Sequence, residues 1–472
     1  MNATKRLRVG AQVLAVAVLA ACGGGSGDAP PPEWSEPVLL ATTPGALSGM
    51  TAKEDASGAW TVAWWQPYPK PGSSGWLHRG AQGAWSSIPG VPVPAEPDRN
   101  SLAAFVTSPD GPLGALVFDD GYRFDEAAWV DTDPRPRHFE PFVRSAGVWQ
   151  SQPEMAPGIP TPACVQSAAS QGLCLLSDPA DGYPRPAVLR FTPAQGWVRT
   201  AETLDMGADE VPNGAHIRLR SLAMNPEGDA LAIWERGIFS TGVPLHTAYH
   251  FYQPATGWSA LGVLPDVDTY TRQGAAIGTG AGSFMVPYVA CTPNTPSSEA
   301  ERPCAPGVAR YTPSGGWQTL ELVPRITVKP FYEPGYGASV RPIIRNPELH
   351  LGAAGQVLAS WWVDSQQWSR VFHPQQGWGP VAAVQPSAPY IYAAHVDSEG
   401  NALIVDQQGV MRYSPQTGWR RIAPLPAGAA GNDVYGRLAT IDSEGNVTLV
   451  WAKTVTAGGV TTSPIFTAQF KP

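Results

Sequence analysis

Short stretches in which apolar and polar residues alternate recur along the whole chain, each introduced by a turn that ends in glycine. The clearest copies are NPEGDALAIW, DSEGNALIVD, DSEGNVTLVW, GAAGQVLASWW and DASGAWTVAWW, and weaker copies surround Gly111, Gly172 and Gly282. Alternation with a period of two is typical of β-strands. The eight glycine turns, from Gly58 to Gly445, predict eight units with a mean spacing of about 55 residues.

A second signature lies between these turns. It consists of an aromatic residue, a proline two positions later and then Gly-Trp, as in RFTPAQGWV and RYSPQTGWR. Complete and looser copies place eight tryptophans in register, again about 55 residues apart: Trp34, Trp85, Trp149, Trp197, Trp258, Trp317, Trp378 and Trp419. Each unit therefore reads as four strands, and four-stranded units at this period are typical of propeller blades. We predict an all-β protein, a β-propeller of eight four-stranded blades, with seven blades as the alternative.

The two ends of the chain fit together in this scheme. The chain finishes AQFKP, which is in register with ARYTP in the repeats and stops where the next Gly-Trp turn should begin. Trp34 begins the series with the missing strand. We therefore predict that an N-terminal strand at 34–40 completes the last blade beside residues 464–470 and closes the ring.

The composition agrees with many turns and few helices. The 472 residues include 50 Gly and 50 Pro, both of which interrupt helices. This argues against a coiled coil or a helical bundle. An apolar content of 43% argues against a disordered chain.

The first residues have the features of an export signal. Three positive charges, at Lys5, Arg6 and Arg8, precede an apolar run that is too short to span a bilayer. The run ends in LAAC, which resembles the lipobox of bacterial lipoprotein signal peptides. That resemblance implies cleavage before Cys22 and attachment of diacylglycerol to its sulfur. An ordinary secretory signal with a chance cysteine is the alternative.

The same resemblance implies a location. Gly23 follows Cys22, instead of the Asp that usually signals retention in the inner membrane, so a lipid-anchored protein of the bacterial cell envelope in the outer membrane is expected. The domain boundaries are then a signal peptide at 1–21, a lipidated flexible tether at 22–33 (GGGSGDAPPPE after the cysteine) and a single propeller domain at 34–472. The lipid bilayer is a partner through the acylated Cys22.

Charge and cysteine content limit the other partners. Without residues 1–21 the chain has 28 basic and 39 acidic residues, a net charge of −11, which is unfavourable for nucleic acid. Export permits disulfides, and we expect two local ones, Cys164 with Cys174 and Cys291 with Cys304. Their spacing matches no metal site, so no metal or cofactor is expected.

Two repeat families share parts of these motifs. DSEGNALIVD resembles an NHL-type blade, although the other units carry aromatic residues where Asp406 stands. The turn PQTGW is similar to the tryptophan-docking turn of PQQ-type eight-bladed propellers, a class that includes an outer-membrane assembly scaffold lipoprotein. Both resemblances imply a propeller. The second also implies a scaffold role in an envelope assembly complex.

Candidate binding residues lie where the inner strands should begin. Insertions at 66–75, 120–136, 202–217, 235–246, 288–306 and 324–342 all fall on the face that carries these strand starts. Basic and tyrosine residues occupy positions eight or ten before the turn glycines, or close to them: Arg218, Arg220, Arg272, Arg345, Tyr390, Tyr392, Tyr435 and Arg437. Arginine suits carboxylate, sulfate or phosphate, and tyrosine suits sugar rings. The alternative is that these arginines pair with loop acids and hold the channel together: Asp209, Glu210, Asp266, Asp268 and Asp433.

Signals for catalysis are weak. The sequence has no HExxH, GxSxG or phosphate-binding loop. His246 and His250 lie on one strand face but have no evident third metal ligand. Acid pairs such as Asp119 with Asp120 could serve in glycoside cleavage. We therefore expect a binding module for a protein or an anionic glycan. The alternatives are a scaffold subunit of an envelope assembly complex and a glycan-cleaving enzyme.

Overall fold

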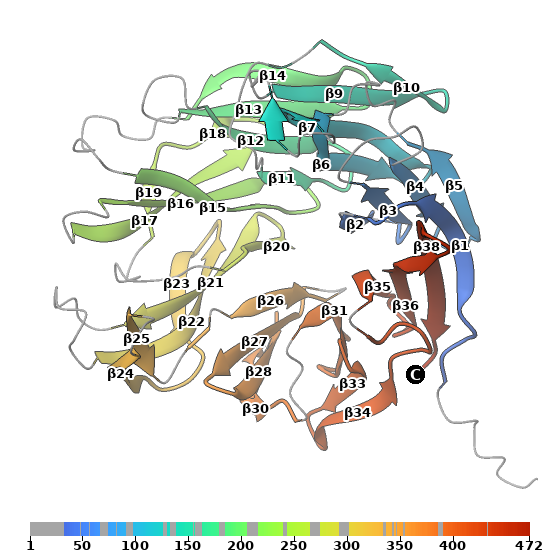
Figure 1. Ribbon diagram of the computed structural model, residues 1–472. Coiled ribbons are helices and arrows are strands. Elements are labelled where there is room, and N and C mark those ends of the chain that lie inside the picture. The colour runs from blue at the N-terminus through green and yellow to red at the C-terminus, as the bar shows by residue number, and fades with distance from the viewer. Residues whose placement is uncertain are drawn as a thin grey trace, which may run out of the picture.

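The computed structural model contains eight antiparallel sheets arranged in a ring (Figure 1). It describes residues 33–472 except for 48, 56, 67–73, 82, 91–97, 126–129, 133–137, 154, 156–162, 179–184, 205–215, 239–242, 265–273, 292–301, 334–336, 342–343, 346, 353–354, 386–389 and 432. In these residues the secondary structure is strand and turn. No helix in this part of the chain is long and apolar enough to cross a membrane.

The first four blades follow one another along the chain, each beginning with its innermost strand. Blade 1 contains β2 (Gly49–Glu54), β3 (Trp60–Trp65), β4 (Ser74–Arg79) and β5 (Trp85–Pro89). Blade 2 contains β6 (Asp98–Ser108), β7 (Gly111–Asp125), β8 (Val130–Thr132), β9 (His138–Ser145) and β10 (Val148–Ser151). Blade 3 contains β11 (Ala163–Gln166), β12 (Gly172–Asp178), β13 (Arg185–Thr192) and β14 (Gly196–Thr203). Blade 4 contains β15 (His216–Met224), β16 (Ala230–Ile238), β17 (Val243–Gln253), β18 (Gly257–Trp258) and β19 (Gly262–Val263).

The remaining four blades complete the ring. Blade 5 contains β20 (Ile277–Gly280), β21 (Ser283–Cys291), β22 (Arg302–Thr312), β23 (Gly316–Glu321), β24 (Ile326–Glu333) and β25 (Gly337–Arg341). Blade 6 contains β26 (Glu348–Leu351), β27 (Val357–Val363), β28 (Gln366–His373), β29 (Gly377–Trp378) and β30 (Ala382–Ala383). Blade 7 contains β31 (Ile391–Val396), β32 (Ala402–Asp406), β33 (Gly409–Ser414) and β34 (Gly418–Pro424). Blade 8 contains β35 (Val434–Ile441), β36 (Val447–Lys453), β37 (Val455–Ala457), β38 (Val460–Phe470) and β1 (Val38–Pro44). The prediction of eight blades is confirmed.

The N-terminal strand closes the ring as predicted. β1 is the outermost strand of blade 8 and pairs with β38 from Val38 opposite Thr467 to Pro44 opposite Thr462 (Figure 1). The strand occupies 38–44 instead of 34–40, because Pro37 has no amide hydrogen to donate. Trp34 lies before it as an isolated bridge to Phe470.

Most of the repeated tryptophans pack on an aromatic residue directly opposite on the neighbouring strand. In five blades the two ring centroids are 5.1–5.3 Å apart, as for Tyr413 and Trp419. Trp34 and Phe470 have the same spacing, 5.3 Å, although they come from opposite ends of the chain. The closure therefore rebuilds the side-chain pair that blades 3 to 7 form within one hairpin.

In blades 2, 7 and 8 the repeated tryptophan also forms a hydrogen bond to the preceding blade. The indole Nε1 of Trp149 donates to the carbonyl oxygen of Pro89 at 3.1 Å, and that of Trp419 donates to Ser369 Oγ at 2.7 Å. Trp34 makes the equivalent bond to the Pro424 carbonyl oxygen at 2.6 Å. Most of the apolar core lies at these boundaries between blades.

Two disulfides have the predicted pairing. Cys164 lies directly opposite Cys174 on β11 and β12 of blade 3, and the two residues are bonded. Cys291 and Cys304 join β21 to β22 in the same way in blade 5. Each disulfide therefore links neighbouring strands within one blade.

Candidate binding site at the mouth of blades 7 and 8

Two exposed tyrosines mark the beginning of neighbouring inner strands. Tyr390 immediately precedes β31 in blade 7, and Tyr435 lies near the start of β35 in blade 8. Their exposed fractions are 65% and 51%, so neither ring is used in packing the blades. Both strands begin on the face of the ring opposite the glycine turns, and we call this face the mouth.

Arg437 holds the loop between β34 and β35 at the mouth. Its Nε donates to the carbonyl oxygen of Ala429 and its Nη2 to that of Gly431, both at 2.7 Å. Its Nη1 lies 3.5 Å from the hydroxyl of Tyr392. Arg437 therefore has a structural role, as the alternative interpretation expects, but it binds carbonyl oxygens instead of acids. A guanidinium carries five N–H donors, and these three contacts involve three of them.

The innermost strand bulges at the candidate positions in three blades. Arg220 lies at the register shift between Leu219 and Ser221 in β15, and Tyr392 lies at the shift between Ile391 and Ala393 in β31. In β35 the shift falls between Tyr435 and Leu438, and it includes Arg437. A bulge places an extra residue on one strand and redirects its side chain. The regular alternation expected for positions eight and ten therefore does not hold there.

The other predicted site residues are more scattered. Arg220 is exposed on blade 4, across the ring from blade 8, and Arg345 is exposed beside blade 6, where its backbone N–H donates to the Trp362 carbonyl oxygen at 3.0 Å. In β15, Arg218 pairs through its backbone with Glu235, but its side chain lies outside the described residues. So do Arg272 and the acids Asp209, Glu210, Asp266 and Asp268.

Asp433, also at the mouth, pairs with a lysine. Its carboxylate lies 3.0 Å from Lys453 Nζ, and the hydrogen bond to that lysine is the main reason why the pKa of Asp433 is lowered. Among the predicted residues, Tyr392 and Arg437 thus contact each other, and Tyr390 and Tyr435 each lie two residues earlier, just before β31 and within β35.

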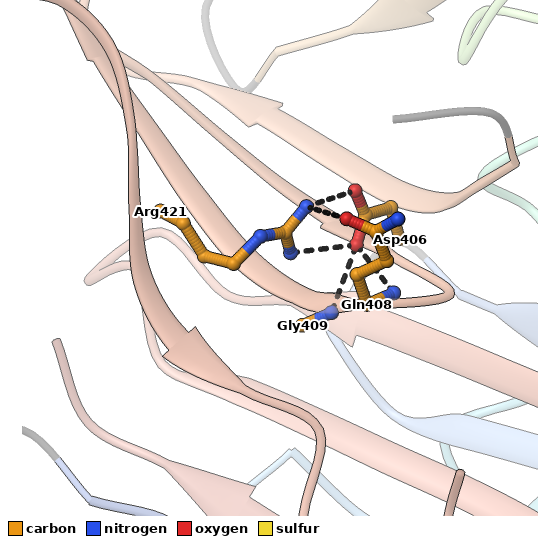
Figure 2. A network of polar contacts seen from close by, with 4 residues as sticks. All are labelled: Asp406, Gln408, Gly409 and Arg421. Carbon is orange, nitrogen blue, oxygen red and sulfur yellow. Dashed lines mark hydrogen bonds and ion pairs between the residues drawn. The ribbon is translucent and has the colours of Figure 1, made fainter. Parts of the chain in front are cut away.

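A buried acid closes the hairpin of blade 7 at this face (Figure 2). Asp406 is 0% exposed, and its Oδ1 accepts the backbone N–H groups of Gln408 and Gly409 at 2.7 and 2.8 Å. Arg421 of β34 donates to both carboxylate oxygens, at 2.9 and 2.8 Å, and to Gln408 Oε1 at 3.1 Å. In the sequence, Asp406 stands out only as a departure from the aromatic residues at this position of the other units. That departure was the signal that this network exists.

Of the candidates His246, His250, Asp119 and Asp120, only His250 has a described side chain. The imidazole of His250 is buried with its centroid 6.2 Å from that of Trp234, so this histidine packs inside blade 4. No cluster of three His, Cys, Asp or Glu that could hold a metal occurs in the part of the chain that the structure describes. The side chains of His246, Asp119 and Asp120 lie outside that part.

Comparison with known proteins finds solved structures that are similar to this chain, but it finds no family to which the chain can be assigned. No protein-family model and no curated protein matches this chain. A post-proline cleaving enzyme from Rickettsia typhi is 9% identical with a TM-score of 0.43, and the alignment covers 88% of this chain and 58% of that enzyme. An α-L-arabinofuranosidase from Fusarium graminearum is 11% identical with a TM-score of 0.33, covering 92% and 97% of the two chains. Plexin A from Drosophila, solved in complex with semaphorin 1b, is 11% identical with a TM-score of 0.37, covering 92% and 88%. Because propellers carry many functions, the function must be argued from the site.

Proposed function

We propose that this protein is a lipid-anchored propeller of the cell envelope that binds an anionic glycan at the mouth of blades 7 and 8. The observation that carries the proposal is the exposure of Tyr390 and Tyr435, each two residues before the contacting pair Tyr392 and Arg437 on neighbouring inner strands. Large aromatic rings that pack no core and lie at the start of neighbouring inner strands are typical of binding surfaces.

The chemistry of these groups suits a charged sugar. A tyrosine ring offers a flat apolar face to the C–H groups of a pyranose and a hydroxyl that can donate or accept. The guanidinium of Arg437 offers N–H donors to a carboxylate or sulfate. Its bonds to Ala429 and Gly431 already fix its position, so little side-chain freedom is lost when a ligand binds.

The anchor rests on the LAAC motif and Cys22. We infer acylation of this cysteine, an outer-membrane location and a tether at 22–33 that leads to Trp34. Replacing Cys22 with Ser should move the protein from the membrane fraction to the soluble fraction and abolish incorporation of labelled palmitate. A protein that stays in the membrane without Cys22 would contradict the anchor but not the binding site.

Binding is tested with an array of uronic-acid and sulfated glycans. The double variant Tyr390→Ala and Tyr435→Ala removes two rings, each contributing about 1 kcal/mol, so its affinity should fall about thirtyfold. The variant Tyr390→Phe with Tyr435→Phe keeps the rings and should retain most of the affinity. Val263→Ala, on the exposed outer strand of blade 4, is a control for a surface change remote from the site.

The result that would overturn the proposal is equal glycan binding by wild type and the double alanine variant. An array with no bound glycan, together with a specific protein co-purifying with the acylated wild type but not with the alanine variant, would instead support a protein ligand at the same mouth.

A further inference from the structure

The blades rise to different heights at the mouth. The second strand of each blade starts at the glycine turn and runs toward the mouth, so its length sets how far the hairpin extends. This strand has 15 residues in blade 2 (β7), nine in blades 4 and 5 (β16 and β21), and only five in blade 7 (β32). β32 is thus four residues shorter than β16, which at roughly 3.3 Å per residue is about 13 Å of strand length.

Two neighbouring blades, 6 and 7, close this hairpin with two-residue turns. In blade 7 the strands β32 and β33 are joined by two residues, Gln407 and Gln408, and in blade 6 the strands β27 and β28 are also joined by two residues. In the neighbouring blade 8 the corresponding hairpin is longer, because β37 extends the pairing with β38. We call the part of the mouth over the turn at Gln407 and Gln408 the low sector.

The low sector is held by specific side chains. In other blades a buried tryptophan stands at the position of Asp406, six residues after the turn glycine: Trp64, Trp234, Trp361 and Trp451. An indole cannot accept the backbone N–H groups of a turn, whereas the Asp406 carboxylate accepts two of them, from Gln408 and Gly409 (Figure 2). The hairpin of blade 7 therefore turns directly after Asp406, the last residue of β32. Arg421 neutralises the buried acid.

The same network orients a polar group into the low sector. Gln408 is exposed, and its Oε1 accepts from Arg421 at 3.1 Å. Because the two ends of an amide point apart, the Nε2 donors of Gln408 are turned away from the guanidinium. They are therefore suited to a hydroxyl or carboxylate oxygen of a ligand lying over the turn.

We propose that the ligand is an extended linear anionic glycan that leaves the mouth over the low sector, instead of a small sugar held at the mouth alone. The inference rests on the proposed function. Tyr390 lies at the base of this sector, directly before the innermost strand of blade 7, and Tyr435 lies at the start of the next inner strand. The longer hairpins of blades 2, 4 and 5 stand on the other sides of the mouth.

The experiment measures Kd by calorimetry for a disaccharide, a hexasaccharide and a dodecasaccharide of galacturonic acid. Wild type should bind the longest chain about tenfold more tightly than the disaccharide, because only the longer chain reaches Gln408. Inserting Gly-Ser-Gly-Ser between Gln407 and Gln408 raises the hairpin into the low sector and should remove that gain while leaving disaccharide binding unchanged. The matched control is the same insertion between Gln416 and Thr417, in the turn at the opposite end of blade 7.

A second variant covers the case in which the insertion disturbs folding. Gln408→Ala keeps the backbone of the turn and should lower dodecasaccharide affinity severalfold without changing disaccharide affinity. The inference is overturned if wild type binds all three lengths equally, or if Gln408→Ala and the folded insertion variant both keep the length dependence. If wild type binds no length, the extended-chain inference is refuted; the proposed glycan function is refuted as well when the array of uronic-acid and sulfated glycans also shows no binding.

Discussion

Ring closure through the two chain ends predicts a specific loss of stability in the variant Trp34→Ala. Removing the indole deletes its contact with Phe470 and its 2.6 Å hydrogen bond to the Pro424 carbonyl oxygen. A fully buried tryptophan costs about 3 to 5 kcal/mol when truncated; Trp34 is only partly buried, which suggests about 2 kcal/mol, and the hydrogen bond adds about 1. With an unfolding entropy of about 2.1 cal/mol/K per residue over about 440 residues, a loss of 3 kcal/mol lowers Tm by about 3 °C.

The assay combines thermal unfolding with hydrogen exchange. In Trp34→Ala the amides of β1, Val38–Pro44, should exchange faster than in wild type, because the strand is no longer held at its start. Trp419→Ala is the matched control, since it removes an equivalent pair with Tyr413 and a bond to Ser369 but leaves the closure intact. Unchanged Tm and unchanged protection of β1 in Trp34→Ala, beside a destabilised Trp419→Ala, would refute the closure argument.

Three further outcomes are expected. Asp406→Asn leaves Arg421 without its counter-charge and should lower the free energy of unfolding by about 3 kcal/mol in urea titrations; a loss below about 1 kcal/mol would contradict the role of this pair. Burial lowers the pKa of His350 from 6.5 to about 4, so the fold favours the neutral ring: stability is present above pH 6.5 and falls by up to about 3 kcal/mol as the pH drops to 4, and His350→Gln should flatten that part of the stability profile. Replacing Cys164 and Cys174 together with Ala opens a short loop and should cost about 3 kcal/mol, seen as a lower Tm under non-reducing conditions; an unchanged Tm would show that the strand pairing alone holds blade 3.

The sequence indicates which strands carry the candidate residues, but it does not indicate how their side chains contact one another. Counting back from the turn glycines placed five of the eight candidate residues on the inner strands β15, β31 and β35, because strand order and turn chemistry are local properties of the chain. The count assumed regular alternation, and the bulges at Arg220, Tyr392 and Arg437 break it. A bulge depends on how a strand meets its neighbour, and a single strand's residue pattern does not report it. The partners of Arg437, two carbonyl oxygens in a loop, carry no side-chain signal at all.

By itself, the sequence determined that the chain is a ring of eight blades, that its ends share the last blade, and that the cysteines pair locally. These features repeat with a fixed period or join residues close together in the chain, apart from the closure, where Trp34 and Phe470 restore a motif already visible in other units. Only the tertiary structure decided what Arg437 holds, that Arg421 neutralises Asp406, and where the mouth is low. Those features depend on contacts between different strands and on the relative heights of neighbouring blades, and neither quantity is periodic along the chain.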